Sequence, residues 1–107
     1  MNVTITPGPL LGTLTPPPSK SQAHRALLAA ALAGGVSTIS NVDLSQDIEA
    51  TLGCLSALGA RMELLGQGRV EVHGLGNSIV QAGPAPILDC GESGSTLRFL
   101  IPVALLV

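Results

Sequence analysis

Two short segments of this sequence place cations and hydroxyl groups at the expected starts of helices. In the first, Ser21 and Arg25 lie four residues apart, and Lys20 and His24 form a second pair with the same spacing. Residues four apart share one helix face, so these side chains would gather around the free N–H groups and the positive dipole end of the helix. Such an arrangement attracts a phosphate or a carboxylate, although solvated charges at a helix end explain the spacing equally well.

The second segment, DCGESGSTLR at residues 89–98, repeats this design. Its glycines allow a ligand to approach the backbone closely, and its hydroxyl groups and arginine can bind an anion. The residues concerned are Gly91, Ser93, Gly94, Ser95, Thr96 and Arg98. Two such segments in one short chain favour anion binding over two chance groups of surface charges.

Other reactive residue types support weaker interpretations. The phosphate-binding patterns GxxxxGK[ST] and GxGxxG do not occur in the sequence. We expect Asp89 to bond the backbone of its own turn rather than pair with Glu92, and His73 to face solvent rather than bind a ligand. Cys54 and Cys90 have neither CxxC spacing nor a histidine partner, so we expect two free, unreactive thiols in a reducing cytosol. The sequence predicts no metal site.

The composition narrows the class of protein. A chain of 107 residues holds one ordinary domain or part of a larger protein. Hydrophobic residues make up 46% of it, charged residues 11% and aromatic residues 1%, so the core must be aliphatic. A net charge of -2 provides no basic surface for nucleic acid or anionic lipid. The start lacks a secretory signal and the apolar runs are shorter than the ~20 residues that span a bilayer, so we predict a cytoplasmic protein.

Helices and short strands must position the two segments. Residues 3–5 and 12–14 are β-prone and predict either two short strands or an arm with a turn, and prolines 16–18 form a stiff connection after them. The first helix should begin near Ser21, which can cap it, and continue through Ala33 to a pair of glycines.

The remaining elements follow from the same kinds of pattern. In the hairpin expected from strands at 61–65 and 69–73, Val70 and Val72 alternate with polar residues, which predicts one buried and one solvated face. Pro102 predicts a kink or an early stop in the last helix. In chain order we expect a strand at 36–40, a helix from its cap Ser45 to Gly59, a hairpin of strands 61–65 and 69–73, a glycine-rich connection at 74–86, a strand at 87–90 and a helix from about Ser95.

Three stretches together resemble the amino-terminal part of the 5-enolpyruvylshikimate-3-phosphate synthase family. They are PPPSKSQAHRALLAAALAGG, NVDLSQDIEATLGCLSALGA and LDCGESGSTLRFLIPVA, and the similarity runs from about Val3 to the end. The resemblance implies transfer of the enolpyruvyl group from phosphoenolpyruvate to the 5-hydroxyl of shikimate 3-phosphate, with release of phosphate. It implies no metal, no organic cofactor, no nucleic acid and no membrane partner, and a monomeric full-length enzyme of aromatic amino acid biosynthesis in the cytoplasm.

The resemblance also implies roles for individual residues. Ser21 and Arg25 would hold shikimate 3-phosphate, while Gly94 would line the phosphoenolpyruvate pocket and Arg98 would bind the anionic groups of that substrate. Lys20 would contact phosphoenolpyruvate, bridge to the shikimate site and serve as the catalytic proton donor. The family's acidic catalytic residues would come from beyond this chain.

The implied fold is an α/β inside-out barrel, in which βαβαββ units pack with their helices inside and their sheets outside. Residues 1–15 would be a strand segment of the opposite lobe, residues 16–93 the first unit, and residues 94–107 the incomplete start of the second. The chain would then form one wall of a cleft between two lobes and have little or no turnover alone. One departure concerns Glu92, where family members often carry asparagine. A carboxylate there would repel anionic substrates unless it points away or pairs with a cation, so the role of Glu92 stays open.

Two alternatives remain open beside this interpretation. A stand-alone anion-binding module that never catalyses would use the same two segments. A related enolpyruvyl transferase that acts on a UDP-sugar is disfavoured, because the residue after the lysine is typically asparagine there and is Ser21 here.

Overall fold

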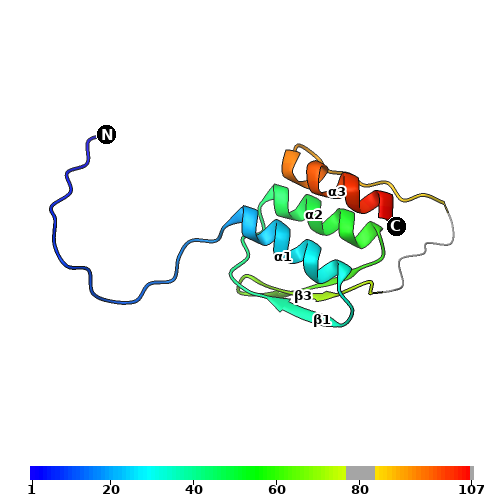
Figure 1. Ribbon diagram of the computed structural model, residues 1–107, viewed down its shortest axis with the longest axis horizontal. Coiled ribbons are helices and arrows are strands. Elements are labelled where there is room, and N and C mark those ends of the chain that lie inside the picture. Colours follow the sequence, from blue (N-terminus) through cyan, green and yellow to red (C-terminus); the bar gives the residue numbers. More distant parts are fainter. Residues whose placement is uncertain (77–83, 107) are drawn as a thin grey trace.

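Helices cover one face of a small sheet in the computed structural model of the protein, which describes residues 1–76 and 84–106 (Figure 1). The described elements are α1 (Lys20–Leu32), β1 (Val36–Ile39), α2 (Gln46–Ala57), β2 (Arg61–Gly66), β3 (Arg69–His73) and α3 (Gly94–Leu106). Helices α1 and α2 pack on the sheet, and α3 packs on both of them from the far side. This mixed architecture confirms the predicted α/β unit.

The sheet is antiparallel throughout, with the strand order β1-β3-β2. In the central strand, Val70 and Val72 point toward the helices and are 1% and 0% exposed, whereas Glu71 and His73 lie on the other face and are half-buried. The predicted alternation in the hairpin is therefore confirmed. Its turn contains Gln67 with a φ of 53° between two glycines that also have positive φ.

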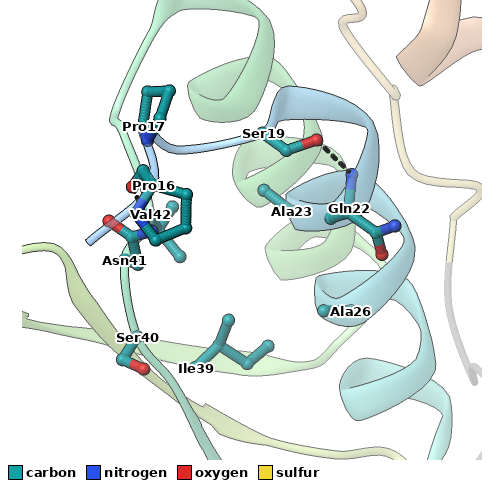
Figure 2. A pocket seen from close by; sticks show the side chains of 10 residues that line it. All are labelled: Pro16, Pro17, Ser19, Gln22, Ala23, Ala26, Ile39, Ser40, Asn41 and Val42. Carbon is teal, nitrogen blue, oxygen red and sulfur yellow. Dashed lines mark hydrogen bonds between the residues drawn. The ribbon is translucent and has the colours of Figure 1, made fainter. Parts of the chain in front are cut away.

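Serine side chains cap the first two helices. Ser45 accepts a hydrogen bond from the backbone N–H of Ile48 at 3.4 Å, which confirms its predicted role. The prediction that Ser21 caps α1 is wrong, because Ser19 is the cap and accepts from the N–H of Gln22 at 3.3 Å (Figure 2). The helix therefore begins at Lys20, and the hydroxyl of Ser21 is left exposed in its first turn.

Aliphatic side chains fill the space between the helices and the sheet, as the composition requires. Leu27 of α1, Ile48 and Leu55 of α2 and Val72 of β3 are each 0% exposed. Leu100 and Val103 of α3 close the same core at 2% and 8% exposure. Burial of a side chain of this kind contributes about 1.5–3 kcal/mol, so packing rather than helix propensity holds the helices in place.

Residues 1–19 form an exposed arm that leads away from the folded part (Figure 1). No strand forms at residues 3–5 or 12–14, so the alternative of an arm describes this region better. Five prolines within residues 7–18 remove backbone donors and restrict φ, which disfavours strand pairing. The side chain of Asn41 donates to the carbonyl of Pro16 at 3.3 Å and tethers the base of the arm.

Three further predictions differ from the structure or fall partly outside it. The strand predicted at 87–90 does not form, because this segment runs beside α2, where Cys54 Sγ donates to the carbonyl oxygen of Asp89 at 3.3 Å. Of the kink or early stop predicted at Pro102, the early stop does not occur, because α3 continues through Pro102 to Leu106. Of the glycine-rich connection, residues 77–83 lie outside the described residues. In the parts of the chain that the structure describes, no helix has both the length and the apolar character needed to cross a membrane.

The close approach of the β3 end to the end of α1 generates a prediction at Gly74. A Cβ at this position would overlap the carbonyl oxygen of Ala33 and lie 2.5 Å from that of Ala30. Gly74→Ala should therefore destabilise the protein by about 1–3 kcal/mol, the usual cost of overpacking. Urea unfolding monitored by circular dichroism measures this change.

Gly53 in α2 provides the matched control, because a Cβ there would meet no atom within 4 Å. Gly53→Ala should stabilise the protein by about 0.5–1 kcal/mol through improved helix propensity. Equal effects of the two alanines would contradict the close approach at Gly74.

Candidate anion-binding site at the helix starts

All three described helices begin at the same end of the molecule (Figure 1). Lys20 Nζ lies 3.1 Å from Asp47 Oδ2, and this ion pair joins the first turns of α1 and α2. Thr96 Oγ1 lies 3.2 Å from the carbonyl oxygen of Asp47, which joins the first turn of α3 to α2. The two segments predicted to bind anions, at residues 19–25 and 89–98, are therefore brought to one edge of the fold.

A chain of buried side-chain hydrogen bonds runs across the three helices below this edge. His24 Nδ1 lies 2.7 Å from Thr51 Oγ1, which lies 2.8 Å from Thr96 Oγ1, and Thr96 Oγ1 donates to Ser93 Oγ at 2.6 Å. All four residues are at most 4% exposed. Among the described residues, no buried side-chain nitrogen or oxygen lacks a hydrogen-bond partner. We call His24, Thr51, Thr96 and Ser93 the buried polar chain.

Sequence reasoning missed the buried polar chain, although a signal for it existed. Thr51 lies three residues after Ile48 and four before Leu55, so it shares their inward face. Thr96 lies four residues before Leu100 and shares a face with it in the same way. A threonine within an apolar stripe needs a buried partner, and here each threonine is a partner of the other.

Acidic residues are unevenly distributed over the helix starts. Helix α2 has Asp47 and Glu49 in its first turn, and these carboxylates offset the positive end of its dipole. Helices α1 and α3 have no acidic residue in their first turns. The positive ends of α1 and α3 therefore remain available to an external anion.

Cations beside the starts of α1 and α3 are exposed. Within the described residues, the guanidinium groups of Arg25 and Arg98 make no hydrogen bond and no ion pair. Lys20 differs, because its ammonium group is paired with Asp47, at side-chain exposures of 57% and 38%. An ion pair this exposed contributes about 0–1 kcal/mol, so a ligand anion can compete for Lys20 at little cost.

The turn before α3 has the geometry that the sequence predicted. Asp89 Oδ1 accepts from the backbone N–H of Gly91 at 2.9 Å, which confirms that this carboxylate bonds its own turn. Ser93 Oγ accepts from the N–H of Thr96 at 3.2 Å and caps α3. A Cβ added to Gly94 would meet no atom within 4 Å, so open space adjoins the backbone at the first residue of α3. Glu92 is exposed.

His24 does not join Lys20 at the surface, contrary to the arrangement expected from their spacing. It is 2% exposed, and its ring lies 6.4 Å from that of Phe99. Burial lowers the pKa of His24 below its ordinary value of 6.5, the charge of Asp47 raises it, and that of Lys20 lowers it. The neutral imidazole of His24 is therefore part of the core, where its hydrogen bond with Thr51 joins α1 to α2.

A groove of about 380 Å³ lies beside the start of α1 (Figure 2). Pro16 and Pro17 of the arm, Ala23 and Ala26 of α1, and residues 39–42 line it, together with Ser19 and Gln22. Its lining is mostly apolar and contains neither Lys20 nor Arg25. The groove therefore borders the candidate anion-binding site without forming part of it.

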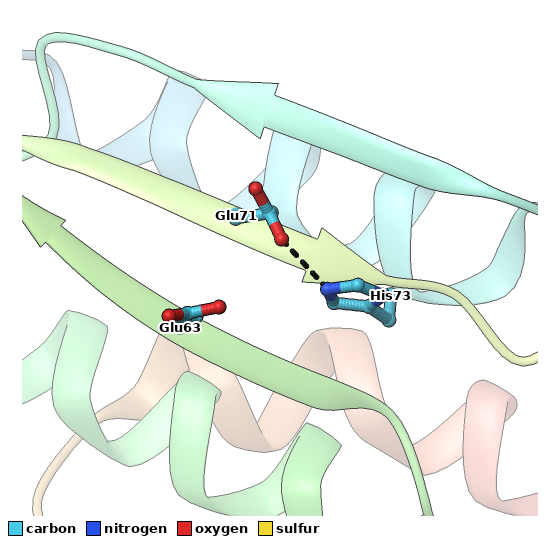
Figure 3. Close-up of side chains that lie close together, drawn as sticks. All are labelled: Glu63, Glu71 and His73. Carbon is cyan, nitrogen blue, oxygen red and sulfur yellow. Dashed lines mark hydrogen bonds and ion pairs between the residues drawn. The ribbon is translucent and has the colours of Figure 1, made fainter.

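The outer face of the sheet carries a separate group of ionisable side chains (Figure 3). One ligand atom from each of Glu63, Glu71 and His73 lies within 4.8 Å of the others, and His73 Nε2 lies 2.8 Å from Glu71 Oε1. Such a group has the chemistry of a metal site, but Arg61 Nη2 lies 3.3 Å from His73 Nε2, where it would repel a cation. His73 is thus paired and half-buried rather than simply solvated.

Comparisons with known proteins agree on one family. Residues 5–107 match the family model described as EPSP synthase (3-phosphoshikimate 1-carboxyvinyltransferase). The chain is 46% identical over 107 residues to the 3-phosphoshikimate 1-carboxyvinyltransferase of Clostridium perfringens strain SM101, covering 97% of this chain and 24% of that protein. It is 49% identical over 102 residues to the enzyme of the same name from Clostridium kluyveri, covering 95% and 23%.

Solved structures give the same result for the fold. The EPSP synthase structure from Acinetobacter baumannii at 2.37 Å superposes with a TM-score of 0.71 and 34% sequence identity, covering 83% of this chain and 20% of that one. The chain thus spans about a quarter of the length of the curated relatives that it matches.

The buried polar chain predicts the effect of one isosteric substitution. Thr51→Val keeps the shape of the side chain but leaves His24 Nδ1 without its partner in a dry environment. The free energy of unfolding should fall by about 1–3 kcal/mol, the cost of one unsatisfied buried group. The same substitution at the exposed Thr38 of β1 should change it by less than about 0.5 kcal/mol, and urea unfolding of both variants measures the difference.

The lowered pKa of His24 predicts how stability depends on pH. Because the folded state resists protonation of His24, the unfolded state binds more protons below the ordinary value of 6.5, so stability decreases as the pH falls below that value. His24→Asn should reduce the loss of stability between pH 7.5 and 5.5 measured by urea unfolding. His73→Asn is the control, and this variant should still show the decrease in stability between pH 7.5 and 5.5 that is due to His24. An unaltered pH dependence in His24→Asn would contradict this assignment.

Proposed function

The chain belongs to the EPSP synthase (3-phosphoshikimate 1-carboxyvinyltransferase) family, and from this premise we propose that it forms one wall of an enolpyruvyl transferase active site. The reaction transfers the enolpyruvyl group of phosphoenolpyruvate to the 5-hydroxyl of shikimate 3-phosphate and releases phosphate. One observation carries the proposal: two helix starts with no acidic residue in their first turns lie at one edge of the fold, each beside an arginine, Arg25 or Arg98, whose guanidinium has no partner among the described residues.

Each substrate has its own binding residues in this proposal. Shikimate 3-phosphate is held at the start of α1 by the hydroxyl of Ser21 and the guanidinium of Arg25. Phosphoenolpyruvate lies in the open space beside Gly94, where Arg98 binds its phosphate or carboxylate. Lys20, positioned between α1 and α2 by Asp47, bridges the two substrates. Charge-assisted hydrogen bonds of this kind are about twice as strong as neutral ones.

Lys20 is the proposed proton donor within this chain. A proton adds to the methylene carbon of phosphoenolpyruvate, and the substrate hydroxyl oxygen bonds to the neighbouring carbon as the hydroxyl gives its proton to a base. Elimination then removes a proton from the new methyl group, restores the carbon–carbon double bond and expels phosphate. The arrangement of fixed cations and helix starts orients both anions and stabilises charge as it develops, which are the major sources of rate enhancement in such sites. The remaining acid and base groups lie outside this chain in the proposal, and no metal or organic cofactor takes part.

The proposal assigns the chain to parts of a larger cytoplasmic, monomeric enzyme. Residues 1–15 belong to the opposite lobe, residues 16–93 form the first unit, and residues 94–107 begin the second. The exposed arm and the match to about a quarter of each relative's length support this division. The chain by itself then binds anions but has little or no turnover.

A non-catalytic anion-binding module is the second candidate, favoured only by the short span of the chain relative to its relatives. Enolpyruvyl transfer discriminates between the two. If the chain is part of a transferase, joining it to the remaining sequence of a family member should give turnover. If the chain is a non-catalytic module, it should give no turnover in any context.

Titration with shikimate 3-phosphate tests the proposed site directly. Amide resonances near Ser21 and Arg25 should shift, and Arg25→Ala should weaken the affinity by about 10- to 100-fold, because a hydrogen bond to a charged group contributes about 1.5–3 kcal/mol. Arg61→Ala, an exposed arginine on β2, is the matched control and should bind normally. No shift at millimolar ligand, or equal losses in both variants, would contradict the site.

A further inference from the structure

Two thiols lie side by side behind the turn that leads into α3. Cys54 of α2 is 1% exposed, and Cys90 at the end of the preceding segment is half-buried. Their Sγ atoms are 4.0 Å apart, and both cysteines are free. A disulfide has an S–S distance of about 2.05 Å, so a small side-chain rotation and a shift of the flanking backbone would join them.

We propose that Cys54 and Cys90 form a modification site, at which a peroxide converts the two thiols into a reversible disulfide that repositions the turn at residues 91–94. The consequence for ligand binding rests on the proposed function, whereas the modification itself does not.

The chemistry proceeds in two balanced steps. The thiolate of Cys90 attacks one oxygen of hydrogen peroxide, so that an S–O bond forms, the O–O bond breaks and hydroxide leaves. The sulfur of Cys54 then attacks the sulfenic sulfur of Cys90 and gives its thiol proton to the departing hydroxyl group, so that the S–S bond forms, the S–O bond breaks and water leaves. In sum, two thiols and one peroxide give one disulfide and two waters, and a dithiol reductant reverses the change.

The environments of the two thiols determine their order of reaction. Cys90 is accessible to a small oxidant, whereas Cys54 is enclosed by the core. Burial, together with the neighbouring Cys90 and Asp89, raises the pKa of Cys54 to about 11, so this thiol stays protonated and resists direct oxidation at neutral pH. Its hydrogen bond to the carbonyl of Asp89 at 3.3 Å nevertheless holds it beside Cys90.

The position of Cys90 links its oxidation to the start of α3. The carbonyl oxygen of Cys90 accepts from the backbone N–H of Ser93 at 3.0 Å, and Ser93 caps α3 through Thr96. Cys54 is enclosed in the core, whereas Cys90 packs at its edge and is half-buried, so closing the S–S distance moves Cys90 more readily than Cys54. This movement displaces the turn and the adjoining Gly94, where the proposed phosphoenolpyruvate site lies.

Mass spectrometry of the purified chain tests the modification. After treatment with hydrogen peroxide and alkylation, the native chain should lose the mass of two hydrogen atoms, retain no free thiol and regain both thiols with dithiothreitol. Cys54→Ser should instead accumulate a sulfenic acid on Cys90 that dimedone traps, and Cys90→Ser should stay unmodified. A sulfenic acid on Cys54, or only disulfides between chains, would overturn the proposal.

A denatured sample supplies the control for proximity. In urea the two cysteines are separated, so formation of the intrachain disulfide should be at least about tenfold slower than in the folded chain, because proximity raises the effective concentration of the resolving thiol. Equal rates in the folded and denatured chains would overturn the claim that the fold builds the site.

Phosphoenolpyruvate titration tests the consequence for binding. The oxidised chain should bind phosphoenolpyruvate at least about tenfold more weakly than the reduced chain, and a Cys54→Ser/Cys90→Ser double variant treated with peroxide should not change its affinity. If the intrachain disulfide forms but the affinity for phosphoenolpyruvate is unchanged, the claim that oxidation displaces the turn at the binding site is wrong. A chain that forms the disulfide but binds no phosphoenolpyruvate in either state would uphold the modification and contradict the proposed function.

Discussion

The buried polar chain from His24 through Thr51 and Thr96 to Ser93 is the interaction on which the rest of this structure depends. Each of its hydrogen bonds between helices lies in a dry core, where an unpaired polar atom costs more than most single contacts contribute. The three helices must therefore keep one relative position along their axes to satisfy all the partners. Aliphatic packing holds the helices together but specifies one position less uniquely than paired hydroxyl groups do, because apolar side chains of similar volume can repack.

Alignment of the helices brings the positive ends of their dipoles to one edge. Each helix start carries about half a positive charge, and of the three described helices only α2 offsets it with acidic residues in its own first turn. Lys20 is shared with α2 through Asp47, while Arg25 and Arg98 are unpaired among the described residues. The edge thus combines exposed cations with two helix starts that have no acidic residue in their own first turns, while the exposed carboxylate of Glu92 directly precedes the cap of α3. An anionic ligand compensates this charge, which agrees with the doubly anionic substrates of the proposed reaction.

Local patterns predicted much of this fold correctly. Ser45 caps α2, the glycine turn closes the hairpin, and Val70 and Val72 face the core, because each of these features depends on near neighbours in the chain. The predictions failed where the local sequence allows more than one structure. Ser19 and Ser21 can both cap a helix, and residues 87–90 form a strand only beside a free strand edge, whereas the fold places them against α2.

The sequence by itself determined the residue types of the candidate site, since lysine, arginine, serine and glycine at helix starts suit anions in any fold. It also determined the family, through motifs that extend over most of the chain. Only the tertiary structure decided which side chains meet. His24 turned inward to Thr51, Thr96 joined α3 to α2, and Cys54 came to lie 4.0 Å from Cys90. Residues far apart in the chain meet only when burial of the helices brings their elements together, and spacing along the sequence does not encode that geometry.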